Sequence, residues 1–136
     1  MHKAALAVVA LLAAVGLSSC SQAKDAAKET ATDAACSLAT SVVDETSGQA
    51  GQAIDEIGAD PRSAQRELKG IRNALATAEK GLSGDVKKQI ADARGAVDDL
   101  LGQARSAAEG ADVDMQAVSR ARGKFDDAID GVRNLC

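Results

Sequence analysis

Aromatic residues and histidine are almost absent from this sequence of 136 residues. It has no tryptophan or tyrosine, its one phenylalanine is Phe125, and its one histidine is His2. The formal net charge is −4 at pH 7. Nucleic-acid binding depends on positive potential and, for single strands, on aromatic stacking. We therefore expect no nucleic acid among the partners of this chain.

Catalytic motifs are also missing. After His2 there is no imidazole that could act as a general base or bind zinc. The sequence has no G-x-S-x-G motif and no glycine loop of the kind that cradles phosphate groups. We expect the chain not to be an enzyme, with no catalytic residue, no metal site and no cofactor.

The one long apolar run lies at the start of the chain. After His2 and Lys3, residues 4–17 are apolar, and this stretch is shorter than the roughly 20 residues that a helix needs to span a bilayer. A polar start, a short apolar run and small residues before a cleavage point are typical of a secretory signal peptide, here residues 1–19. The alternative is a buried N-terminal helix, which the rest of this small chain could hardly cover.

The end of this segment reads Leu17-Ser18-Ser19-Cys20. It resembles the lipobox of bacterial lipoproteins, in which an aliphatic residue and two small residues precede a cysteine. The resemblance covers residues 1–20. It implies a diacylglycerol on the Cys20 sulfur, cleavage before Cys20 and acylation, for example by palmitate, of the new amino group. The protein would then be anchored by lipid to a cell membrane, on its periplasmic or extracellular side, without spanning it.

Lipid on Cys20 leaves two cysteines, Cys36 and Cys136. Export delivers them to an oxidising compartment, where an even number of thiols usually closes into disulfides. We expect an intramolecular Cys36–Cys136 disulfide. Free thiols, or a bridge between two chains, are the alternatives.

The mature chain divides into a tether and a helical domain. Residues 20–32 are small and polar and predict a tether, in part helical because alanine, lysine and glutamate favour helix. Residues 33–136 show no alternation typical of strands, and turn signals divide them into four helices of similar length: about Asp33 to Ile57, Asp60-Pro61 to Lys80, Ser83 to Glu109, and Asp112 to Leu135.

Apolar residues recur every three or four positions in the last three helices, which indicates one buried face on each. The expected core positions are Ala64, Leu68, Ile71, Leu75, Ala78 and Leu82; Val86, Ile90, Ala93, Val97, Leu100, Ala104 and Ala107; and Val118, Ala121, Phe125, Ile129, Val132 and Leu135. The first helix is the weakest, since polar residues fill positions 44–49.

Cysteine positions add a topological argument. Cys36 lies near the start of the first predicted helix and Cys136 at the end of the last. In an up-and-down arrangement these ends meet only if the number of helices is even. We therefore predict an all-α fold: an up-and-down four-helix bundle, closed by the disulfide and monomeric.

Two recurring patterns allow more than one interpretation. Acidic pairs at Asp55-Glu56, Asp98-Asp99 and Asp126-Asp127 could form a cation site, but solvated helix faces with ion pairs such as Arg94–Asp98 and Arg122–Asp126 are favoured. Glycines inside the predicted helices indicate close helix approach or a groove, or else a tolerated Ala/Gly-rich background, which is favoured; they are Gly48, Gly51, Gly70, Gly95, Gly102, Gly123 and Gly131.

Two functional classes remain. The first is a lipid-anchored envelope protein that acts by non-enzymatic interaction with a protein partner, or structurally. The second is a carrier of a lipid or other apolar ligand between the helices. The first is favoured because few bulky apolar residues remain once a core is filled: Leu, Ile, Val and Phe make up 20 of the 117 residues from Cys20 onward.

Overall fold

The computed structural model describes residues 20–136, with side chains from Thr32 onward. The described chain is all-helical and contains no strand: α1 (Cys20–Glu56), α2 (Pro61–Lys80), α3 (Gly84–Ala108) and α4 (Met115–Leu135). The predicted helical class and the number of helices are confirmed for this part of the chain. The predicted signal peptide, residues 1–19, lies outside the described residues.

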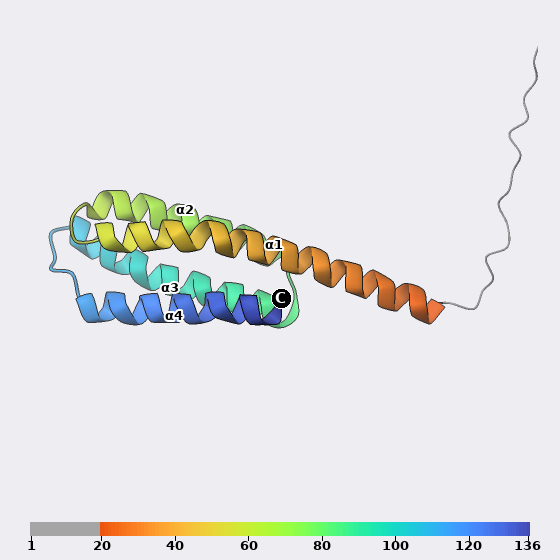
Figure 1. Ribbon diagram of the computed structural model, residues 1–136. Coiled ribbons are helices and arrows are strands. Elements are labelled where there is room, and N and C mark those ends of the chain that lie inside the picture. Colours follow the sequence, from red (N-terminus) through yellow and green to blue (C-terminus); the bar gives the residue numbers. More distant parts are fainter. Residues whose placement is uncertain (1–19) are drawn as a thin grey trace, which may run out of the picture.

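The first helix differs from the prediction at its start. It includes Cys20 instead of starting at about Asp33, so residues 20–32, predicted as a tether that is in part helical, are helical throughout. This segment contains neither glycine nor proline and is rich in alanine, lysine and glutamate, which are good helix formers. Figure 1 shows this part of α1, in red and orange, running beyond the ends of the other helices.

The start of α2 follows the prediction. The Asp60 side chain accepts a hydrogen bond from the Ser63 amide at 3.1 Å, and Pro61 occupies the first turn. Proline suits this position because the first amides of a helix have no partner within the helix. The predicted start of α3 at Ser83 is also found, although the Ser83 side chain makes no capping hydrogen bond.

The start of α4 was predicted wrongly. The capping residue is Asp114, not Asp112, and its Oδ1 accepts from the amides of Gln116 and Ala117, both at 3.0 Å. The reason lies at the end of α3, where Gly110 has a left-handed φ of 96° and the Ala111 amide bonds back to the Ser106 carbonyl. The chain needs this additional turn before α4 can begin.

The buried core matches the predicted spacing in the last three helices. The buried members are Ala64, Leu68, Ile71, Leu75, Ala78, Leu82, Ile90, Ala93, Val97, Leu100, Ala104, Val118, Ala121, Phe125, Ile129 and Val132. Val86 and Ala107 are only half-buried. Leu135 was predicted wrongly: it is 46% exposed, because it is the last helical residue, at the open end of the bundle.

Small residues continue the core through the part of α1 in which polar residues interrupt the apolar pattern. Thr46, Ala50 and Ala53 are buried there, although the surrounding sequence is polar. The Thr46 hydroxyl donates to the Val42 carbonyl at 2.7 Å, so its burial leaves no unpaired donor. The first helix therefore packs against the others through small side chains, which the spacing of large apolar residues does not indicate.

Neighbouring helices pack in chain order. The main contacts join α1 to α2, α2 to α3 and α3 to α4, while α1 and α4 make fewer contacts and α1 and α3 the fewest. The predicted disulfide is confirmed: Cys36 and Cys136 are bonded, with their Cα atoms 5.4 Å apart. It links α1 to the end of α4, at the end of the bundle from which α1 projects (Figure 1).

Candidate functional site

The predicted anchor residue, Cys20, is the first residue of α1. The same helix runs without a break through Cys36 to Glu56. At 1.5 Å per residue, the helical segment from Cys20 to the disulfide is about 24 Å long. Any group attached at Cys20 is therefore joined to the bundle by regular helix.

The disulfide spans the neighbouring pair of helices with the fewest contacts. Cys36 on α1 is half-buried and Cys136 is exposed. Along the same seam Arg133 on α4 forms an ion pair with Asp44 on α1, with a nitrogen–oxygen distance of 3.4 Å. Both side chains are largely exposed, so this pair contributes little. The covalent bond is the stronger connection between α1 and α4.

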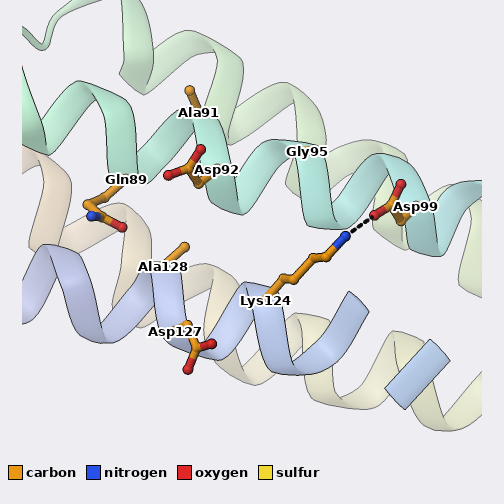
Figure 2. A pocket seen from close by; sticks show the side chains of 8 residues that line it. All are labelled: Gln89, Ala91, Asp92, Gly95, Asp99, Lys124, Asp127 and Ala128. Carbon is orange, nitrogen blue, oxygen red and sulfur yellow. Dashed lines mark hydrogen bonds and ion pairs between the residues drawn. The ribbon is translucent and has the colours of Figure 1, made fainter. Parts of the chain in front are cut away.

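An open groove of about 680 Å³ lies between α3 and α4 (Figure 2). Its charged side chains are Asp92 and Asp99 from α3 and Lys124 and Asp127 from α4. The Lys124 ammonium pairs with Asp99 at 3.4 Å. In Figure 2 the Asp92 and Asp127 side chains lie apart from that pair. The groove is acidic and wide, and its carboxylates do not converge on one point.

Helix packing separates the two carboxylates of the acidic pair Asp98-Asp99. Asp98 turns to one side of α3 and pairs with Arg72 of α2, whereas Asp99 turns to the other side and pairs with Lys124 of α4. The two carboxylates therefore link α3 to two different neighbours. Among the residues whose side chains are described, no group of three His, Cys, Asp or Glu residues is placed to hold a metal ion.

The ion pairs predicted within helices are formed in part. Arg122 and Asp126 lie 4.0 Å apart, as predicted. Arg94 instead pairs with Glu79 of α2 at 3.1 Å, and its predicted partner Asp98 pairs with Arg72. One predicted contact within α3 is thus replaced by two ion pairs between α2 and α3.

A second groove, of about 470 Å³, lies between α2 and α3. Its floor includes Leu101 and Gly102, and its polar residues are Gln65, Lys69, Arg72, Asp98 and Arg105. Three side chains are cationic and one is anionic, so this groove is positively charged in a chain that is acidic overall. The sequence alone does not predict this groove, because its cations belong to two different helices.

A third, smaller groove of about 330 Å³ is more apolar. It lies between the end of α1 and the start of α4, at the end of the bundle opposite the disulfide (Figure 1). Ile54, Ile57 and Val118 contribute apolar atoms to it, and Met115 stands at its edge with 66% of its surface exposed. This end of the bundle points away from Cys20.

The helix glycines do not mediate close approach at most positions. At six of the seven, a Cβ atom would meet nothing within 4 Å: Gly48, Gly51, Gly70, Gly95, Gly102 and Gly123. Gly131 is different, because a Cβ there would lie 2.5 Å from the side-chain amide of Gln89 on α3. Gly95 lines the groove between α3 and α4 and Gly102 the groove between α2 and α3, whereas no contact requires glycine at the other four. At Gly131 a Cβ would require only the flexible Gln89 side chain to move.

Neither the helices nor the similarity comparisons supply a function directly. No helix among the described residues has the length and hydropathy that a membrane crossing requires. No protein-family model, no curated protein and no solved structure matches the chain.

Proposed function

We propose that the chain is a lipid-anchored protein of the bacterial cell envelope that acts by non-enzymatic interaction or in a structural role. One observation carries the proposal: Cys20 lies in α1, and this helix continues unbroken from there into the core of the bundle. Lipid on Cys20 would hold the folded part near the membrane on a helical stalk. A helix resists bending more than a flexible linker of the same number of residues, so the bundle would stand clear of the bilayer.

The finer fold belongs to the same proposal. It is an up-and-down four-helix bundle that follows a cleaved lipoprotein signal peptide of residues 1–19. Contacts between consecutive helices support this topology, as do the short connections between them and the covalent link from α1 to the end of α4. The L-S-S-C sequence ending at Cys20 supports the signal peptide.

The far end of the bundle would meet partners in the envelope. The α1–α2 and α3–α4 connections lie together at the end opposite the stalk (Figure 1). The exposed Met115 side chain and the apolar groove beside it lie at this end. Anchored through Cys20, the protein would present this end away from its own membrane.

The alternative function is carriage of a lipid or other apolar ligand. The groove of Ile54, Ile57, Met115 and Val118 is the observation that favours it, because these side chains offer apolar surface at an opening. Its volume of about 330 Å³ is at the small end of ligand pockets, which are roughly 300–1,000 Å³. Native mass spectrometry of the protein extracted from its own membranes would distinguish the two: a retained apolar ligand supports carriage, and its absence supports interaction.

The anchor is tested by replacing its cysteine. We expect Cys20→Ala to abolish incorporation of radiolabelled fatty acid and to leave the uncleaved precursor, because the acceptor sulfur and the cleavage site are both lost. Ser19→Ala is the matched control, since alanine also satisfies the small-residue requirement before the cysteine. Undiminished labelling of the Cys20→Ala protein would overturn the lipid anchor.

The non-enzymatic role is tested separately. We expect the purified protein to show no turnover of esters, glycans or peptides from the envelope. A reproducible activity that disappears when one serine, lysine or carboxylate is changed would contradict this part of the proposal and would leave the anchor unaffected.

A further inference from the structure

The second helix has a charge opposite to that of the whole chain. It carries five basic residues, Arg62, Arg66, Lys69, Arg72 and Lys80, and two acidic ones, Glu67 and Glu79, which gives a net charge of +3. The whole sequence has a net charge of −4. A cationic helix on an acidic protein creates a local positive potential that attracts anions.

Part of this charge is concentrated in the groove between α2 and α3. Lys69 and Arg72 contribute from α2, Arg105 from α3, and Asp98 is the one acidic side chain that lines it. Arg72 is paired with Asp98. Among the residues whose side chains are described, Lys69 and Arg105 form no ion pair. The groove therefore has a net charge of +2 and two cations that are not neutralised by a carboxylate.

The floor of the groove leaves room for a ligand. Gly102 has no side chain, and a Cβ added there would meet nothing within 4 Å. Leu101 beside it is only 8% exposed, so this part of the floor is mostly covered by its neighbours and projects little into the groove. Gln65 adds a side-chain amide, which can donate hydrogen bonds.

We propose that the groove between α2 and α3 binds a phosphate monoester group. Such a group carries a charge of about −1.5 to −2 at neutral pH, which matches the net charge of the groove. The Arg105 guanidinium can donate two parallel hydrogen bonds to phosphate oxygens, and the Lys69 ammonium adds a point charge. The Gln65 amide supplies a further donor. The phosphate could belong to a lipid headgroup or to a soluble ester, and both present the same chemistry to these side chains.

The matched test uses three single substitutions in the oxidised mature chain, residues 20–136, with Cys20→Ser so that no lipid contributes. Gly102→Glu introduces a carboxylate at the open floor of the groove. Gly123→Glu makes the same change at an equally open position on α4, outside the groove. Asp98→Asn removes the acidic residue that competes for Arg72. All three positions are exposed and helical, so the fold should be retained, and circular dichroism checks this.

The soluble probe is glycerol 3-phosphate, titrated at constant ionic strength because salt screens surface charges. Amide NMR shifts at Lys69, Gly102 and Arg105 report the binding. We expect saturable shifts at these residues, an affinity roughly ten-fold lower in Gly102→Glu because one charge-assisted contact is lost, and no change in Gly123→Glu. Asp98→Asn should bind more tightly, an effect that a purely structural role of Asp98 would not produce.

The lipid probe is a vesicle of phosphatidylcholine with or without phosphatidic acid, whose headgroup is a phosphate monoester. Flotation that requires phosphatidic acid and is lost in Gly102→Glu supports the groove and identifies a lipid source. Binding of glycerol 3-phosphate without flotation supports the groove and identifies a soluble ester. The proposal is overturned if neither probe binds, or if Gly102→Glu and Gly123→Glu have the same effect on both.

Discussion

The glycines within helices have different surroundings and therefore different consequences. Gly70 and Gly123 lie in regular helix, and a Cβ at either would meet nothing within 4 Å. Glycine in a helix loses more backbone freedom on folding than alanine does, and it lacks a side chain that could compensate. Glycine at these two positions therefore reduces the stability of the fold, and no contact in the structure requires glycine there.

We expect Gly70→Ala and Gly123→Ala each to raise the free energy of unfolding by up to about 1 kcal/mol. Urea denaturation followed by circular dichroism would measure the change. Gly110→Ala is the contrasting control, because its φ of 96° is unfavourable for a residue with a Cβ, and we expect it to destabilise the protein. A loss of stability in both Gly70→Ala and Gly123→Ala would contradict the open surroundings of these residues.

At the scale of single helices, the caps decide where each one begins. Asp112 and Asp114 are both exposed aspartates before α4, and either could act as an N-cap by sequence alone. Val113, between them, packs against the core, and Val118 is buried one turn into the helix. This pair flanks Asp114 in the positions of a hydrophobic staple, which favours a helix that starts at Met115.

We expect Asp114→Ala to lower the free energy of unfolding by about 1 kcal/mol, within a range of roughly 0.5–2 kcal/mol, because two amides of α4 lose their acceptor. Asp112→Ala removes the same charge without removing a capping hydrogen bond, and we expect a change below about 0.5 kcal/mol. Thermal unfolding of the two variants under identical conditions compares them directly. Equal losses would mean that charge, not capping, is responsible.

The sequence predicts helices well where the signal is local. The starts of α2 and α3 and the buried faces of the last three helices could be predicted, because caps and apolar spacing act within one helix. Residues 20–32 were predicted to be only in part helical, since the good helix formers of a polar segment do not indicate how much of it is ordered. The contribution of Thr46 and Ala50 was missed because small buried residues resemble the Ala-rich background.

Some of the candidate sites could likewise be predicted from the sequence, and others depend on how the helices pack. Cys36 and Cys136 could be paired from the sequence, because only two cysteines remain after Cys20 and the number of helices sets where they lie. The groove between α2 and α3 could not be predicted, because Lys69 and Arg105 become neighbours only through packing. Arg94 shows the same limit, since its partner Glu79 belongs to another helix.

For the whole molecule, the stability of the fold is limited by a core that contains many small side chains. Ten of the twenty-five buried apolar residues are alanine. A buried alanine removes less apolar surface from water than leucine or phenylalanine does, so it contributes less to stability. The stability of a helical bundle with such a core therefore depends more on disulfides and helix caps than that of a bundle filled with leucine.

The disulfide makes the largest of these contributions to the stability of the fold. It joins residues 100 positions apart, and closing a loop of this length stabilises the fold by up to about 4.7 kcal/mol on the chain-entropy model. Typical small domains have a total stability of roughly 5–15 kcal/mol. Reduction should therefore remove a large part of the stability of this protein, most of all along the seam between α1 and α4, where contacts are fewest among neighbouring helices.

We expect reduction to lower the melting temperature of the mature chain by about 10 °C or more, since 1 kcal/mol corresponds to about 4–8 °C in a domain of this size. Far-UV circular dichroism with and without reductant measures the shift, and a thiol count confirms reduction. A Cys36→Ser, Cys136→Ser double variant serves as the control: it should melt at the temperature of the reduced protein and should not respond to reductant. Equal melting temperatures of the oxidised and reduced protein would show that packing alone holds α1 against α4.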